Sequence, residues 1–189
     1  VEELQAEILR LQGFKPFNNT EVDLGLGPLT KAFPDCSFPL GAIHEFLCDQ
    51  IENSASTKGF ISGLLAPLMK NNGTGMWIST CRDVFPPALK AFGIEPDRFI
   101  FVDLKKEKDI LWSLEEALKS SALTAVVGEV QEMTFTASRR LQLAVERSQV
   151  TGFILRHNLR NVTTSACVPR WRITSLPSVP IAIGTDDAL

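Results

Sequence analysis

Apolar runs alternate with helical patterns from about residue 40 onward, and this alternation limits the fold more than any other feature of the chain. Most of the runs are continuously apolar, as in strands that are covered on both faces. Repeated β-α-β units of this kind predict an α/β fold with a doubly wound, mainly parallel sheet. The predicted strands are residues 42–47, 76–80, 99–103, 124–130 and 152–156, with 171–175 as a late strand of antiparallel character, and the predicted helices are 59–71, 86–92, 107–120 and 136–149.

The segment between the first strand and the first helix has the position of a phosphate-binding loop. Such loops follow the pattern G-x-x-x-x-G-K-[ST], in which glycines let backbone N–H groups turn inward, lysine reaches the phosphates and a hydroxyl binds Mg²⁺. Residues 48–59 read CDQIENSASTKG, so no glycine precedes Lys58, and Gly59 stands where the hydroxyl belongs. Lys58 is therefore a weak candidate for nucleotide binding, and a solvated surface lysine is the favoured interpretation.

Composition indicates an ordinary globular domain. The chain has 189 residues, 44% of them hydrophobic, and a net charge of −3, which does not indicate a nucleic-acid binder. Its four cysteines and two histidines lack metal-ligand or disulfide spacing, so we expect free thiols in a reducing cytoplasm and neither a metal nor another cofactor. No apolar run is long enough to span a bilayer, and no signal peptide is visible.

Several longer motifs make the chain similar to one protein family. They are residues 38–47 (FPLGAIHEFL), 85–103 (FPPALKAFGIEPDRFIFVD), 111–119 (LWSLEEALK), 125–130 (AVVGEV), 136–144 (TASRRLQLA), 150–157 (VTGFILRH) and 166–173 (ACVPRWRI). Over residues 38–177 the chain resembles the ImuA family, the RecA-like accessory proteins of bacterial translesion DNA synthesis. The resemblance implies a RecA-like core and two partners, an inactive Y-family-polymerase-like ImuB and an error-prone replicative-type polymerase.

The groups that hydrolyse ATP in RecA-like proteins are not matched here. Gly128 stands where the strand 124–130 would end in the Walker B aspartate, and we expect Glu129, one place later, on the opposite face of the sheet. Cys81 follows the strand 76–80, where a RecA-like ATPase carries its catalytic glutamate. Phosphoryl transfer depends on positioned phosphates, metal and water. The resemblance therefore implies a RecA-like protein without ATPase activity and without catalytic residues.

Basic residues gather in the second half of the chain and are candidates for partner or DNA binding. Arg156, His157 and Arg160 follow a strand, at the edge of an α/β sheet where ligands gather. Arginine suits both phosphate contact and protein docking, and the negative overall charge favours a protein partner over weak, salt-sensitive DNA contact. The alternative is a solvated face that pairs with acidic residues of the same chain. The full candidate set is Arg139, Arg140, Arg156, His157, Arg160, Arg170 and Arg172.

Three tryptophans and one histidine are interpreted as packing residues. Trp77 and Trp112 lie within strand and helix patterns, which favours burial of both. Trp171 lies between two arginines on a predicted strand, so its ring is expected inward and the arginines outward. His44, inside the first strand, is interpreted as a hydrogen-bonded histidine at the edge of the core.

Three functions remain open from the sequence. The favoured one is a non-catalytic scaffold of error-prone DNA repair that docks onto an ImuB-type partner; the others are a residual ATP-dependent DNA-binding protein and a SulA-like inhibitor of a polymerising partner. Self-association is compatible with each of them. The predicted organisation is an N-terminal helical and extended segment (1–37) with an amphipathic helix at Leu4, Ile8 and Leu11, a core domain (38–177) and an acidic tail (178–189).

Overall fold

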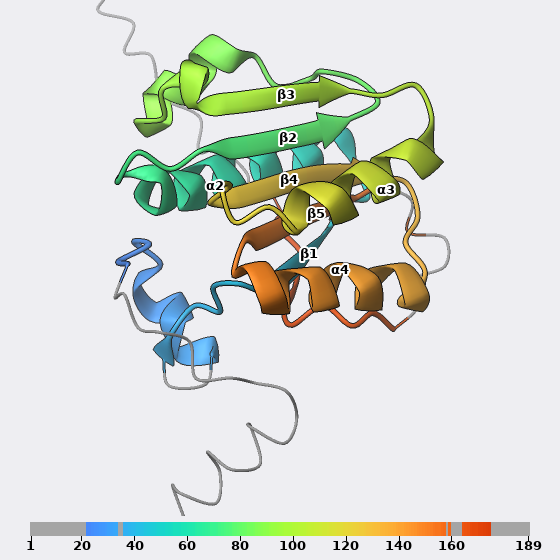
Figure 1. The fold of residues 1–189 in the computed structure, drawn as a ribbon. Coiled ribbons are helices and arrows are strands. Elements are labelled where there is room, and N and C mark those ends of the chain that lie inside the picture. Colours follow the sequence, from blue (N-terminus) through green and yellow to red (C-terminus); the bar gives the residue numbers. More distant parts are fainter. Residues whose placement is uncertain (1–21, 34–35, 158, 160–163, 175–189) are drawn as a thin grey trace, which may run out of the picture.

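A computed structural model of the chain describes residues 22–33, 36–157, 159 and 164–174. These residues form a six-stranded parallel sheet in the order β3-β2-β4-β5-β1-β6, with helices on both of its faces (Figure 1). The predicted α/β fold with a doubly wound sheet is confirmed. The strands are β1 (Ile43–Leu47), β2 (Gly75–Ser79), β3 (Phe99–Asp103), β4 (Ala125–Val130), β5 (Thr151–Arg156) and β6 (Arg170–Trp171).

The last strand differs from its prediction in direction and length. β6 runs parallel to β1, with Glu45 opposite Arg170 and Phe46 opposite Trp171, whereas the sequence pattern suggested an antiparallel strand over 171–175. Because the connection from β5 is long, the chain can return to the amino edge of the sheet before β6 begins, as a parallel neighbour requires. Backbone bonds from Val168 N–H to Ile43 O (3.0 Å) and from Glu45 N–H to Pro169 O (3.0 Å) extend the pairing before β6.

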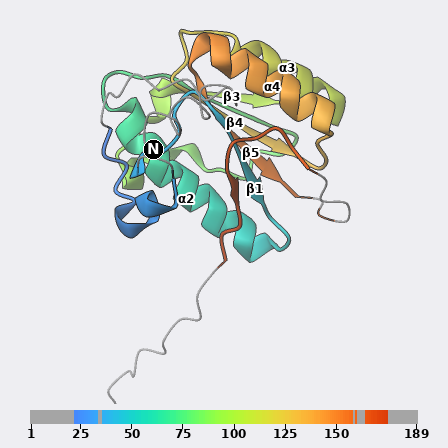
Figure 2. The same ribbon diagram turned by 90° about the horizontal axis from the view of Figure 1, so that it is seen from below.

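The helices divide between the two faces of the sheet. Helix α2 (Ile51–Met69) covers one face, and α3 (Glu107–Leu118) and α4 (Phe135–Ser148) cover the other (Figure 2). Each strand alternates between these two layers, so Val127 packs in the α2 layer and Val126 in the α3–α4 layer. The predicted helix over 86–92 is the 3₁₀ helix η3 (Pro86–Phe92), and the shorter 3₁₀ helices η1 (Gly27–Ala32) and η4 (Pro96–Arg98) complete the described elements.

Helix α2 begins much earlier than the sequence pattern predicted. Its first residue is Ile51, so the connection from β1 is short, and Lys58 lies inside the helix instead of at the end of a loop. Residues 51–58 contain neither glycine nor proline. Near the start of the helix, Asn53 Nδ2 donates to Asp49 Oδ1 at 2.5 Å. The Glu52 carboxylate lies in the first turn, where the positive end of the helix dipole stabilises a negative charge. A glycine-rich phosphate cradle therefore has no counterpart at this position.

Most of the predicted packing residues are where we expected them. Trp77 is buried, and the Trp171 ring packs on Phe46 with ring centroids 5.7 Å apart while Arg172 is exposed. Trp112 is the exception, because 64% of it is exposed on the outer surface of α3. The helical pattern placed it near apolar positions, but the buried side of α3 is formed by Ile110, Leu114, Ala117 and Leu118.

His44 is fully buried and hydrogen-bonded on both sides of its ring. Its Nε2 lies 2.7 Å from Pro39 O, and Trp171 Nε1 donates to Nδ1 at 3.3 Å. A carbonyl on one side and an N–H donor on the other require the neutral ring with its proton on Nε2. Burial lowers the pKa of His44 to about 3, although the bond to Pro39 acts in the opposite direction.

The segment before the core domain contributes to the core itself. Leu26 is buried against the α2 layer, and Leu24 and Phe33 pack beside it. The predicted amphipathic helix at residues 4–11 and the predicted acidic tail at 178–189 lie outside the described residues. In the part of the chain that the structure describes, no helix is long and apolar enough to cross a membrane.

Candidate functional site

A cavity of about 350 Å³ lies at the carboxyl edge of the sheet. In parallel α/β sheets this edge is the usual position of ligands. Its walls come from the β1–α2 connection, the segment after β2 and the ends of β4 and β5. The lining residues are Cys48, Asp49, Gln50, Ile51, Ser54, Ser79, Thr80, Cys81, Asp83, Glu129, Gln131 and His157.

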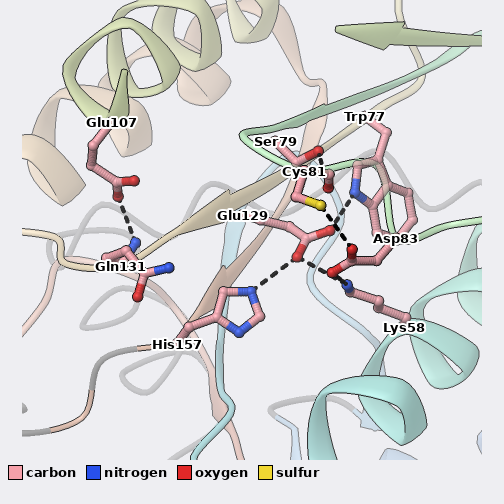
Figure 3. A network of polar contacts seen from close by, with 9 residues as sticks. All are labelled: Lys58, Trp77, Ser79, Cys81, Asp83, Glu107, Glu129, Gln131 and His157. Carbon is pink, nitrogen blue, oxygen red and sulfur yellow. Dashed lines mark hydrogen bonds and ion pairs between the residues drawn. The ribbon is translucent and has the colours of Figure 1, made fainter. Parts of the chain in front are cut away.

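Glu129 is the centre of a polar network at one wall of the cavity (Figure 3). Its carboxylate accepts a hydrogen bond from Trp77 Nε1 at 2.8 Å and lies 2.9 Å from His157 Nε2. Lys58 Nζ is 3.1 Å from the same carboxylate. Burial alone would raise the pKa of Glu129, but these partners together hold it below its ordinary value. Glu129 is therefore an ionised, nearly buried carboxylate with partners on three sides.

Lys58 lies between two carboxylates. Besides Glu129, its Nζ contacts Asp83 Oδ2 at 3.2 Å, and only 13% of its side chain is exposed. The Cys81 thiol donates to Asp83 at 3.1 Å, and this bond together with Lys58 lowers the pKa of Asp83. The interpretation of Lys58 as a solvated surface lysine is wrong, because two acidic side chains bind its ammonium group and cover it.

The structure reverses the predicted orientation of Gly128 and Glu129. A Cβ atom at Gly128 would lie 2.4 Å from a methyl carbon of Leu114, so this position faces α3 and has no room for a side chain. Glu129 faces α2 and Lys58. The alternation along the strand was correct, but the sequence did not reveal which of the two positions faces α2. A carboxylate is thus present on the α2 side of β4.

The cavity is poorly suited to phosphate. Three carboxylates line it (Asp49, Asp83 and Glu129), whereas Lys58 is already paired with two of them. Phosphate binding would require Lys58 to leave these partners, and the remaining carboxylates would repel the anion. Both lining thiols have raised pKa values, Cys48 because of burial and Cys81 because of Asp83, so they stay protonated at neutral pH. Among the described residues, no group of His, Cys, Asp and Glu is arranged to hold a metal ion.

Comparisons with known proteins agree with the α/β fold and identify the family. No protein-family profile matches the chain. Two curated relatives, both named Protein ImuA and from two strains of Caulobacter vibrioides, are each 33% identical over 160 residues. The match covers 78% of this chain and 66% of each relative. This chain belongs to the ImuA family. The crystal structure of SulA from Pseudomonas aeruginosa is similar in fold, with a TM-score of 0.51 and 16% identity over 64% of this chain and 100% of that one.

The arginines that the sequence grouped together are divided between separate places in this ImuA-family fold, and Arg156 and Arg170 share one of them. Arg156 is 3% exposed and its Nη1 lies 3.4 Å from Glu45 Oε1, inside the sheet. Arg170 Nε and Ser165 Oγ donate to the other oxygen of Glu45, at 2.8 and 2.7 Å. The prediction that Arg156 is exposed is wrong, since a buried carboxylate on the neighbouring strand pairs with it. This cluster holds β6 against β1.

The remaining candidates have different positions. Arg139 and Arg140 are exposed on α4. Arg140 pairs with Glu115 of the neighbouring helix α3 at 2.5 Å, and Arg139 lies 4.0 Å from Glu146 of α4. Arg172 is exposed after β6, and His157 lines the cavity. Arg160 lies outside the described residues. Of the basic candidates, Arg139 and Arg140 thus form one exposed patch on this ImuA-family protein.

Sequence reasoning missed the acidic residues of the cavity. Asp49, Asp83 and Glu129 each follow or end a strand that leads to the carboxyl edge of the sheet. Because the ends of parallel strands meet at one edge, this shared position was a signal that could have brought the three residues together. The search for a phosphate-binding motif instead directed attention to basic residues and glycines.

Proposed function

We propose that this ImuA-family protein is a non-catalytic accessory component of the ImuA/ImuB system of damage-induced mutagenesis and acts by binding partner proteins. The observation that carries the proposal is the position of Lys58 between Asp83 and Glu129. The cation nearest to the expected nucleotide site is neutralised by the protein's own carboxylates. The fold supplies a rigid α/β scaffold, and its function depends on surfaces rather than on turnover.

The geometry of the β1–α2 connection also supports a role without ATP hydrolysis. This connection spans residues 48–50, too short for a phosphate cradle, and helix α2 follows at once. The Cys81 side chain bonds to Asp83 and is held protonated. Glu129 is on the α2 side of β4, but its oxygens contact Lys58, His157 and Trp77. A metal-bound nucleotide would have to displace several of these contacts.

Calorimetry with ATP and Mg²⁺ tests the absence of nucleotide binding. We expect no saturable heat at sub-millimolar nucleotide, because Lys58 and the lining carboxylates are already paired. Lys58→Ala should leave partner binding intact. It should lower the stability of the fold, because it removes two ion pairs and leaves Glu129 without its lysine partner. A micromolar dissociation constant that disappears in Lys58→Ala would favour the residual ATP-dependent function.

The proposed partners are an ImuB-type polymerase homologue and an error-prone polymerase, with weak DNA contact as the secondary possibility. On the described surface, Arg139 and Arg140 are the best-placed of the candidate arginines, because their side chains are 54% and 61% exposed even though each has a carboxylate of the same chain nearby. Arginine is enriched in protein interfaces, and exposed charges accelerate the encounter with a complementary partner. We propose that these two residues belong to the docking surface.

Co-purification with an ImuB-type protein, with and without DNA, tests the docking surface. Arg139→Glu/Arg140→Glu should weaken capture of the partner, increasingly at low salt, while the melting temperature changes little, because exposed pairs contribute about 0–1 kcal/mol. Lys70→Glu/Lys90→Glu makes the same change of charge on a different surface and should bind normally. Equal capture by both double variants would remove the α4 arginines from the proposal, and a loss that occurs only with DNA present would favour DNA contact.

A further inference from the structure

The walls of the cavity carry more negative than positive charge. Asp49, Asp83 and Glu129 line it, and no lysine or arginine of the described residues does so. A hydrogen bond from the first turn of α2 lowers the pKa of Asp49, as the partners described above do for the other two carboxyl groups, so all three are ionised at neutral pH. Lys58 offsets one of these charges, and Arg172 acts on Asp49 from outside the lining (Figure 3). The cavity therefore attracts a cation.

The distribution of the carboxylates favours a guanidinium group over a metal ion. Asp49 comes from the β1–α2 connection, Asp83 from the segment after β2, and Glu129 from β4. Among the described residues they form no group that is arranged to hold a metal ion. A guanidinium has five N–H donors in one plane and stays charged in proteins, whereas an ammonium group is a compact and strongly hydrated charge. Acceptors on separate walls therefore suit the end of an arginine side chain.

A buried hydroxyl group on the wall of the cavity has no partner. Ser54 lines the cavity and is only 9% exposed, and in the described part of the chain its Oγ makes no hydrogen bond. Two other serines of α2 do bond within the helix: Ser56 Oγ donates to Glu52 O at 3.0 Å, and Ser62 Oγ donates to Lys58 O at 2.8 Å. Since buried polar groups are normally hydrogen-bonded, the free Ser54 hydroxyl indicates a polar group that binds in the cavity.

The lining changes from exposed to buried in the way that a long basic side chain requires. Ile51 is 81% exposed, the highest value among the large apolar side chains of the described residues, and the Asp83 side chain is 59% exposed. Glu129 is 8% exposed and Cys48 is 2% exposed. Arginine packs its methylene groups on apolar surface while its charged end reaches polar groups. An exposed isoleucine beside buried acceptors offers both kinds of contact.

We infer that this cavity binds the guanidinium group of an arginine that a protein partner supplies. Asp83 and Glu129 pair with its charge, the Ser54 hydroxyl accepts one of its N–H groups, and Ile51 packs on its methylene groups. Arginine is one of the residues that contribute most to the affinity of protein interfaces. The inference rests on the proposed function in one respect, namely that this protein binds partner proteins. It adds a second contact region, at the carboxyl edge of the sheet, to the arginines of α4.

Titration of the full chain with N-acetyl-arginine methylamide, followed by ¹H–¹⁵N NMR at pH 8, tests the cavity without any partner. The indole N–H of Trp77 donates to Glu129 at 2.8 Å, so its resonance should shift in a saturable way, while that of the exposed Trp112 should not. The citrulline derivative has the same shape without the charge and should cause no such shift. Asp83→Asn should raise the dissociation constant at least about tenfold, whereas Glu95→Gln, which removes an exposed carboxylate elsewhere, should bind as wild type does. Equal shifts with arginine and citrulline, or no saturable shift, would overturn the inference.

Capture of an ImuB-type protein tests whether the arginine comes from a partner. Asp49→Asn/Asp83→Asn should weaken capture, and Glu95→Gln/Asp97→Asn, with the same loss of charge at two exposed positions, should capture normally. Normal capture by the first double variant would show that the partner does not supply the arginine, and the inference would be wrong. If wild type captures no such protein, the proposed function fails, and the arginine titration still decides whether the cavity binds a guanidinium group.

Discussion

Replacing Glu45 with glutamine is expected to lower the free energy of unfolding by about 3–5 kcal/mol, as removal of one member of a buried ion pair typically does. Glu45 is fully buried, and Arg156 facing it is 3% exposed. Glutamine keeps the volume of the side chain but removes the negative charge that both Arg156 and Arg170 face. Because Arg170 and Ser165 bind the same carboxylate, β6 should also separate from β1 more easily. Urea unfolding measures the total loss.

Glu146→Gln is the matched control for this prediction. Glu146 is on the surface of α4 and lies 4.0 Å from the exposed Arg139, so its loss should change the free energy of unfolding by no more than about 1 kcal/mol. Hydrogen exchange of the β1 backbone amides separately measures whether β6 separates from β1. Equal stability of the Glu45→Gln and Glu146→Gln variants would show that the buried cluster does not stabilise the fold.

Acidification is expected to destabilise the protein through His44, beginning near pH 6.5. Burial lowers the pKa of His44 to about 3 in the folded chain, whereas an unfolded histidine titrates near 6.5. Between these values the unfolded chain binds the additional proton, so stability rises with pH and falls as the pH decreases. The loss approaches about 1.4 kcal/mol per pH unit and amounts to about 2 kcal/mol between pH 7 and pH 5.

Urea unfolding at pH 7 and pH 5 measures this loss, and His44→Gln is the comparison. The variant should be less stable at pH 7, because the buried ring and its bond from Trp171 Nε1 are lost. It should also show a flatter pH dependence, because an amide can donate to Pro39 O but does not take up a proton. All other side chains are the same in the two proteins, so the difference between their pH profiles isolates His44. Parallel pH profiles of wild type and His44→Gln would contradict the assigned burial effect.

The sequence predicted β1 to β5 because these strands are continuous apolar runs. Residues such as Val126, Val127 and Ile154 lie in short, continuously apolar runs, and a sheet covered on both faces buries every position of such a run. The motifs around residues 136–144 and 166–173 indicated the ImuA family, which the curated relatives confirm. The sequence was a poorer guide to where helices begin and end. The mostly polar residues 51–58 suggested a loop, yet they form the first part of α2.

The candidate site was predicted only in its location, at the carboxyl edge of the sheet. A one-residue difference decides whether a side chain faces α2 or α3, and the strand pattern around Gly128 and Glu129 is equally apolar on both sides. The pairing of Lys58 with Asp83 joins residues far apart in the chain, and no local pattern encodes it. Trp112 shows the same limit, since its exposure depends on the rotation of α3 against the sheet.

The sequence by itself therefore determined the fold class, the family and the absence of a glycine-rich phosphate loop, because each depends on residues close together in the chain. The tertiary structure decided which charged side chains are buried, which are paired and which are exposed. Arg156 is buried against Glu45, Lys58 is held by Asp83 and Glu129, and Arg139 and Arg140 remain in solvent. Whether a charge is buried or exposed depends on which strands and helices become neighbours, and sheet order β3-β2-β4-β5-β1-β6 sets those neighbours only when the whole chain has folded.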